Sequence, residues 1–184
     1  MKATEMLMHE HDFILRVIAS MEKAVVNIAN PDVTPQFFLQ AADFIKNFAD
    51  ACHHAKEEGV LFKMLSAAGV GVEGGPIGVM LTEHEQGRQL TRAMRSAAEQ
   101  WAHGDLNART ETTFSAMSYA SLLRQHINKE NRVLFPMADQ MIPHIKQIAM
   151  WQEFERIERE ETGEGIHEKY EALAEKLEAQ AADF

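Results

Sequence analysis

One pattern of histidine, glutamate and apolar residues occurs twice in this chain of 184 residues, and the second copy follows the first by 73 positions. The pattern has three parts: a Glu-His dipeptide, a His-x3-Glu motif and a Val-Leu-Phe triplet. The first copy places them at 10–11, 53–57 and 60–62, and the second at 83–84, 126–130 and 133–135. Each half is therefore predicted to be a helix with Glu-His followed by a helix with His-x3-Glu.

Helical periodicity extends over most of the chain. Good helix formers dominate and alternating runs of β-branched residues are absent, so the sequence predicts an all-α fold. The expected helices span about 3–27, 35–67, 77–103 and 106–134, followed by two more after Pro143 and Gly165. Pro136 is expected to end or kink the fourth helix, because proline lacks the N–H that a helix needs.

Short connections between four long helices predict an up-down-up-down four-helix bundle. We expect this bundle to occupy residues 1–140. The last two helices, over residues 141–184, are expected to pack on the bundle as a C-terminal extension.

Composition narrows the classes of partner. The formal net charge of −10 would repel a phosphate backbone, so nucleic acid is not expected as a partner. No apolar run reaches the length of a membrane span or of a signal peptide, so no membrane partner is expected. The single cysteine, Cys52, excludes an internal disulfide and fits a reducing compartment. The expected location is the cytoplasm.

The spacing of histidine and glutamate indicates a metal site. Residues four positions apart lie about 6 Å apart along one helix face, so both side chains can reach one ion or two neighbouring ions. Buried histidine and glutamate are costly unless they bind something. The repeat selects six candidate ligands: His11, His53, Glu57, His84, His126 and Glu130. Bridging carboxylates with outer imidazoles favour two iron ions, with manganese or zinc as alternatives because they accept the same ligands.

Four segments resemble, in order, the helix motifs of the hemerythrin-like (HHE cation-binding) family: EHDFIL (10–15), HHAKEEGVLF (53–62), GPIGVMLTEHEQGR (75–88) and HINKENRVLFP (126–136). The tail, FERIEREETGEGIHEKYEAL (154–173), resembles the extended bacterial version. The resemblance implies a four-helix bundle with a non-haem di-iron centre, an oxo or hydroxo bridge and a position for dioxygen or a related small ligand. It assigns the ligand role to the same six residues.

The third motif departs from the annelid-type oxygen carriers of this family, which have His-x3-His there. Here His84 is followed four positions later by Arg88, so one histidine is missing. His54 is the nearest substitute and a candidate extra ligand, because some members of the family use that position. A centre with one nitrogen fewer favours redox chemistry or sensing over reversible oxygen carriage.

Other residues receive structural interpretations. His9, His103, His144 and His167 are interpreted as surface or helix-end histidines. Tyr119 is interpreted as a core residue, with a hydrogen bond toward the metal pocket as the alternative. The expected apolar lining consists of Ile14, Phe44, Phe48 and Phe135.

The preferred function is binding of dioxygen or a related small ligand by a di-iron protein, for storage or sensing of oxygen, nitric oxide or iron. Two alternatives stay open. One is a di-iron oxidoreductase acting on peroxide or nitric oxide. The other is a bundle in which metal only holds the helices and the C-terminal helices bind a partner. The sequence leaves the physiological ligand and the oligomeric state open.

Overall fold

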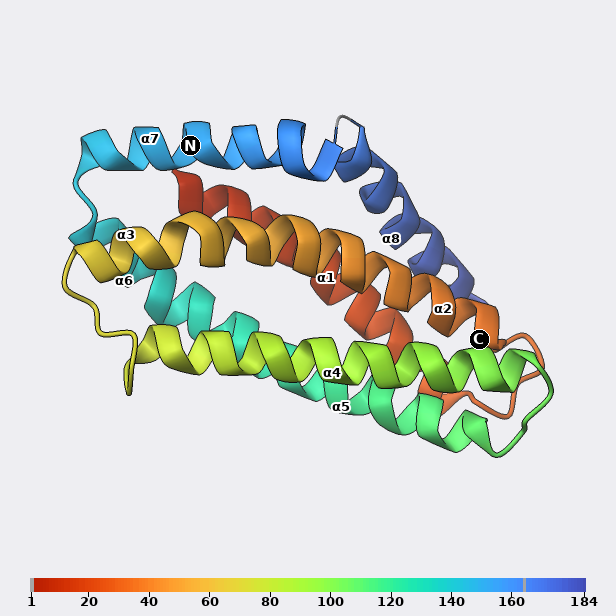
Figure 1. Ribbon diagram of the computed structural model, residues 1–184. Helices are drawn as coiled ribbons and strands as arrows, with labels where there is room; N and C mark the ends of the chain where they lie inside the picture. Colours follow the sequence, from red (N-terminus) through yellow and green to blue (C-terminus); the bar gives the residue numbers. More distant parts are fainter. Residues whose placement is uncertain (1, 164) are drawn as a thin grey trace.

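The computed structural model describes residues 2–163 and 165–184, and these ranges contain helices and no strand (Figure 1). Labels with η mark π-helical segments. The first bundle helix is α1 (Ala3–Val26), and the third is α4 (Pro76–Ala102). The second bundle helix consists of α2 (Pro35–Phe44), η1 (Ile45–His54), η2 (Glu57–Leu61) and α3 (Phe62–Ala67). The fourth consists of α5 (Ala108–Lys129), η3 (Glu130–Leu134) and α6 (Phe135–Met141). After them come α7 (His144–Arg156), η4 (Ile157–Gly163) and α8 (Ile166–Ala182).

Bundle helices that follow one another in the chain run in opposite directions, as Figure 1 shows. This arrangement confirms the prediction of an all-α, hemerythrin-like bundle with additional C-terminal helices. None of the described helices is both long enough and apolar enough to cross a membrane.

Local sequence explains where the bundle helices begin and end. Pro35 and Pro76 stand at the first helical position, where a missing N–H costs nothing. Two glycines with positive φ, Gly69 at 102° and Gly104 at 100°, end α3 and α4. After Gly69, the N–H of Val70 donates to the carbonyl of Leu65, which closes a Schellman turn. Short loops follow, so consecutive helices pack side by side.

The fourth helix does not end at Pro136, so that alternative of the prediction was wrong. The helix continues through Pro136 to Met141. The π-helical segment η3 immediately precedes this proline. A π-helical turn holds an extra residue, so it widens the helix where an α-helical ladder would place the proline ring against a carbonyl.

The buried interior consists of two apolar clusters with a polar layer between them. Along α1, Leu7 belongs to the first cluster, His11 to the polar layer and Ile14 to the second cluster. The same order occurs along α4, where Met80 precedes His84 and Met94 follows it. The fold therefore places polar residues in the middle of the bundle, with apolar side chains on both sides.

Each C-terminal helix completes one of these clusters. Met150 and Phe154 of α7 pack in the Leu7 cluster. Tyr170 and Leu177 of α8 pack in the Ile14 cluster. The division into a bundle over 1–140 and an extension over 141–184 stays a prediction, because both parts share the same buried clusters.

Candidate metal centre

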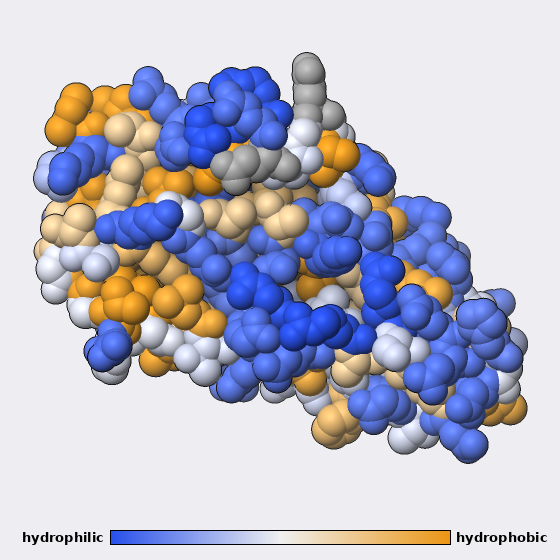
Figure 2. All heavy atoms as spheres, in the orientation of Figure 1, coloured by the Kyte–Doolittle hydropathy of each residue, from blue (hydrophilic) through white to orange (hydrophobic). Residues whose placement is uncertain are grey.

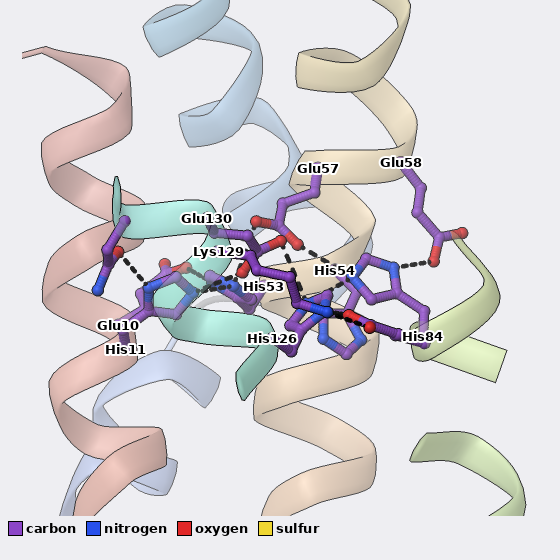
Figure 3. Close-up of polar contacts among 12 residues, drawn as sticks. Glu10, His11, His53, His54, Glu57, Glu58, His84, His126, Lys129 and Glu130 are labelled. Atoms are coloured by element: carbon purple, nitrogen blue, oxygen red, sulfur yellow. Dashed lines mark hydrogen bonds and ion pairs between the residues drawn. The ribbon is translucent and has the colours of Figure 1, made fainter. Parts of the chain in front are cut away.

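Four histidines of the polar layer, one from each bundle helix, are at most 2% exposed. They are His11 of α1, His53 of η1, His84 of α4 and His126 of α5. The Nε2 atoms of His11 and His53 lie 3.0 Å apart, and those of His84 and His126 lie 3.1 Å apart. The histidines of each half of the repeat therefore form a pair whose Nε2 atoms converge (Figure 3).

Two glutamates lie between the histidine pairs, and each has one carboxylate oxygen toward each pair. Glu57 Oε1 lies 3.5 Å from His53 Nε2, and its Oε2 lies 3.4 Å from His84 Nε2. Glu130 Oε2 lies 3.2 Å from His11 Nε2, and its Oε1 lies 3.2 Å from His126 Nε2. Both side chains are completely buried. This is the arrangement that two bridging carboxylates would adopt between two neighbouring cations.

The side chains in the layer form two groups in which the potential ligand atoms all lie within 4.8 Å of one another. The His11 group consists of His11, His53, Glu57 and Glu130. The His84 group consists of His54, Glu57, His84 and His126. The structure thus brings together all six residues selected by the repeat, and it adds His54 to the half in which Arg88 stands in place of a histidine.

His54 is 5% exposed and lies flat against His84, with ring centroids 3.8 Å apart. His54 is adjacent to His53 in the sequence. On a regular α-helix the two side chains would therefore not both face the interior of the bundle. Both lie at the end of the π-helical segment η1, whose wider turn brings the two consecutive side chains inward. Burial and the neighbouring His84 hold the pKa of His54 well below its usual value. This imidazole is therefore neutral and has a free lone pair.

An oxygen atom fixes the outer nitrogen of every histidine in the two pairs. His11 Nδ1 lies 2.8 Å from Asn131 Oδ1, and His84 Nδ1 lies 2.7 Å from Glu58 Oε1. In the same way, His53 Nδ1 contacts Glu10 Oε2 at 2.8 Å and His126 Nδ1 contacts Glu83 Oε2 at 2.9 Å. These oxygens accept hydrogen bonds, so each Nδ1 donates its proton outward and each Nε2 faces the centre, where it can bind a metal ion once it has released its own proton.

These supporting residues obey the same offset of 73 positions. Glu10 corresponds to Glu83, and both hold the second histidine of their own half. Asn131 corresponds to Glu58. Each accepts a hydrogen bond from the histidine of the Glu-His dipeptide in the opposite half. The repeated Val-Leu-Phe triplet also has a role here, because Phe135 stacks on His11 and Phe62 stacks on His84. The repeat therefore specifies the support of the histidines as well as their positions.

The donor set fits a pair of cations. Within the described part of the chain, all four oxygens of Glu57 and Glu130 are buried without a hydrogen bond, and their polar contacts are the ion pairs with histidine Nε2 atoms at 3.2–3.5 Å. Burial lowers the pKa of His84, but the ion-pair contact with Glu57 and the hydrogen bond to Glu58 outweigh it and raise the pKa to about 9. Burial raises the pKa of Glu130, but His126 and His11 outweigh it and hold the pKa well below its usual value. Without metal, imidazolium protons supply the positive charge that dications would otherwise supply.

The two halves of the repeat differ in the surroundings of the glutamate that accepts a hydrogen bond from the second histidine, which is Glu10 in the first half and Glu83 in the second. Glu10 is paired with Lys56, which also contacts Glu158 of η4, and His167 Nε2 of α8 lies 3.4 Å from Glu10. The corresponding pair, Glu83 with Lys129, lies at the surface. Glu10, Glu158 and His167 could together reach one cation, but the ammonium of Lys56 already pairs with Glu10 and Glu158, so we assign no metal to this group.

Some residues outside the ligand set can be compared with their interpretation from the sequence. His167 lies at the start of α8, so the helix-end alternative holds, although its side chain is only 22% exposed and contacts Glu10 and Phe48. Tyr119 is buried in the core as expected, but its hydroxyl makes no hydrogen bond to any described residue. The four apolar residues expected to line the bundle, Ile14, Phe44, Phe48 and Phe135, are all buried.

The supporting residues lie outside the set of ligands that the repeat selects, so the sequence analysis did not identify them. The signal is nevertheless present, because Glu58 and Asn131 are related by the same offset of 73 positions. Lys56 and Lys129 could have been found with the same offset.

Comparison with known proteins agrees with this geometry. The model of the hemerythrin HHE cation binding domain matches residues 2–138, which include every residue of both groups. Uncharacterized proteins of Mycobacterium bovis and Mycobacterium tuberculosis are 27% identical over 163 residues, which cover 88% of this chain and 63% of each relative. The chain therefore spans less than two thirds of the length of these curated relatives. No solved structure matches it significantly. On the family match over most of its length, the chain belongs to the hemerythrin HHE cation-binding domain family.

Proposed function

We propose that this chain holds two iron ions in the polar layer and binds dioxygen, or a related small ligand such as nitric oxide or peroxide, at that centre. The ligands would be His11, His53, Glu57, His84, His126 and Glu130, with His54 as an additional ligand in the His84 group. Storage or sensing of oxygen, nitric oxide or iron is the role that we infer. Manganese or zinc would fit the same donors.

One observation carries this proposal: Glu57 and Glu130 are completely buried, and none of their four oxygens has a hydrogen-bond partner in the described residues. Two such carboxylates repel each other and lose their hydration, which is costly unless cations lie between them. Each glutamate has one oxygen toward each histidine pair. Two neighbouring cations would satisfy all four oxygens at once.

Bound iron would supply a Lewis-acid and redox-active centre. The residues of this chain would do the remaining work. Asn131, Glu58, Glu10 and Glu83 hold the outer nitrogens of the histidines, which keeps the Nε2 lone pairs directed inward. The apolar clusters on both sides of the layer restrict the access of water.

A second candidate is an oxidoreductase that acts on peroxide or nitric oxide. It is favoured by a cavity of about 310 Å³ that reaches His54, because turnover requires exchange of substrate and product with solvent. The two candidates differ in a direct test with dioxygen and peroxide. A binding protein forms an adduct whose absorption disappears on degassing, whereas an oxidoreductase consumes peroxide continuously.

The decisive experiment measures metal content and the ultraviolet-visible spectrum after reconstitution with iron. We expect about two irons per chain in the wild type, together with the near-ultraviolet absorption of an oxo-bridged iron pair. His53→Ala should lose both, and His54→Ala should retain most of the iron because His84 and His126 remain. His103→Ala is the control, since His103 is exposed and its ring contacts the carbonyl of Glu99 in its own helix. A wild type without iron, or a His53→Ala variant with unchanged iron, would overturn the proposal.

A further inference from the structure

A cavity of about 310 Å³ lies beside the polar layer, between the second bundle helix and α4. Its lining includes Ile45, Lys46, Asp50 and His54 from η1, and Gly87, Arg88 and Arg95 from α4. Figure 2 shows strongly hydrophilic side chains across the middle of the face formed by these helices, around a small apolar hollow. His54 belongs both to this lining and to the His84 group. The cavity therefore connects the surface with the candidate metal centre.

Two buried donor atoms at this cavity make no hydrogen bond within the described residues. The hydroxyl of Tyr119 is buried, and it has no hydrogen-bond partner in the ranges that the structure describes. Nη2 of Arg95 is also buried without a hydrogen bond, although it lies 3.5 Å from Asp43 Oδ1. Buried polar groups without partners are rare in folded proteins and call for an explanation. Two orphaned donors in one cavity point to a ligand that accepts hydrogen bonds.

The charge of the lining has the sign opposite to that of the whole chain. Lys46, Arg88, Arg92 and Arg95 contribute four positive charges, and Asp50 contributes one negative charge. Acidic side chains outside the lining pair with the arginines, but each guanidinium has five N–H groups, so donors remain for a ligand. Lys46 has no ion pair within the described residues. Glu58, Glu85 and Asp43 offset the arginine charges, so the cavity offers an anion the charge of Lys46 and the remaining guanidinium N–H donors, in a chain of net charge −10.

Gly87 keeps one wall of the cavity free of a side chain. It lies in the interior of α4, where glycine weakens a helix relative to alanine. Packing does not require glycine there, because a Cβ would lie 3.5 Å from Tyr119 Cε2 and 3.6 Å from Leu123 Cδ2, which is ordinary contact. A longer side chain would extend into the space beside Tyr119.

The geometry points to an oxyanion-binding site in this cavity, with the ligand oxygens accepting hydrogen bonds from Tyr119 and Arg95 and facing the charge of Arg92 and Lys46. The ligand class is a small oxyanion, either inorganic such as nitrite or organic such as a short carboxylate. Its role as the substrate or effector of the metal centre rests on the proposed function. Binding in the cavity does not, because apart from His54 the lining contains none of the candidate metal ligands.

The test uses the full chain reconstituted with zinc, which does not broaden nuclear magnetic resonance signals. Sodium nitrite, sodium acetate and the neutral analogue acetamide are titrated separately while the arginine Nε–H signals are followed. Saturable shifts of Arg92 and Arg95 are expected with nitrite or acetate, but not with acetamide. Arg16 and Arg124 are internal controls, because they pair with glutamates outside the cavity. A preference for nitrite or for acetate would identify the inorganic or the organic source.

Three variants sharpen the test. Tyr119→Phe removes a hydroxyl that has no partner, so the melting temperature should stay the same or rise while the dissociation constant of the oxyanion rises about tenfold. Gly87→Leu should abolish binding by filling the cavity, whereas Gly87→Ala should preserve it. Arg124→Gln should change nothing. Equal shifts with acetamide, equal shifts of all arginines, or an unchanged dissociation constant in Tyr119→Phe would each overturn the inference.

Elemental analysis of the same sample separates this inference from the proposed function. Absence of bound zinc with saturable oxyanion shifts would contradict the metal centre and support the cavity site. Stoichiometric zinc without such shifts would contradict the cavity site alone.

Discussion

Lys56 and Lys129 occupy equivalent positions in the two halves of the repeat, but their surroundings differ. Lys56 is completely buried, and its ammonium contacts Glu10 and Glu158. Burial lowers the pKa of Lys56, but Glu10 outweighs it and raises the pKa above its usual value, so the side chain stays charged. Lys129 is 39% exposed, and its partner Glu83 is 15% exposed. The same ion pair is thus present once in the interior and once at the surface.

Replacing each lysine with methionine measures this difference. Lys56→Met leaves the buried carboxylate of Glu10 without its main counter-charge, so the free energy of unfolding should fall by about 3–5 kcal/mol. Lys129→Met breaks an exposed pair and should cost about 1 kcal/mol or less. Urea denaturation of both variants is the measurement. Equal losses for both variants would show that the C-terminal helices do not isolate Glu10 from solvent.

The positions of the six candidate ligands followed from the sequence because the repeat allowed each histidine and glutamate to be checked against a second copy. Their role as ligands stays a prediction. The contact between His167 and Glu10 did not follow, because it depends on how α8 approaches the bundle. His167 has no counterpart in the repeat, so only the tertiary packing of the extension could place it.

At the scale of helices, α8 is an integral part of the buried interior. Leu177 and Ala174 are completely buried, and Tyr170 OH donates to Asp43 Oδ2 of α2 at 3.0 Å. The helix also has an ion pair to α1, between Glu178 and Arg16. Apolar packing of this extent predicts that α8 unfolds together with the bundle.

Leu177→Ala tests this cooperation between α8 and the bundle. Removing a completely buried leucine should lower the free energy of unfolding by about 2–5 kcal/mol within a single transition. Leu106→Ala is the control, because Leu106 is 70% exposed and should change stability by no more than about 0.5 kcal/mol. Separate unfolding of α8 before the bundle would contradict the expectation.

Helix number and order followed from periodicity and from the Gly and Pro breaks, since these are local properties. The π-helical segments did not follow, although His53, Glu57 and Glu130 lie in them. A π-helical turn is less favourable than an α-helical one, so it forms only where tertiary contacts stabilise it. In a π-helical turn, a side chain therefore points in a different direction from the one expected for an α-helix. For this reason the sequence left the role of His54 as a ligand open.

For the molecule as a whole, metal would act as a stabilising ligand of the folded chain. Ligand present at 100 times its dissociation constant contributes about 2.7 kcal/mol, so chelation should lower the melting temperature by about 5–10 °C. Scanning calorimetry before and after treatment with EDTA gives this difference. A Glu57→Gln, Glu130→Gln double variant should show no difference. An unchanged melting temperature in protein that has lost its metal would contradict a structural role for the ions.

The placement of Glu57 and Glu130 between the histidine pairs also affects how the protein would take up metal when metal is scarce. On the proposed function, a cation bound at one position would hold both carboxylates for the second position. Loading would therefore be cooperative, and a limited supply of iron would divide the population into full and empty chains instead of leaving every chain half filled. The amount of active protein in a cell would then follow iron supply more steeply than proportionally.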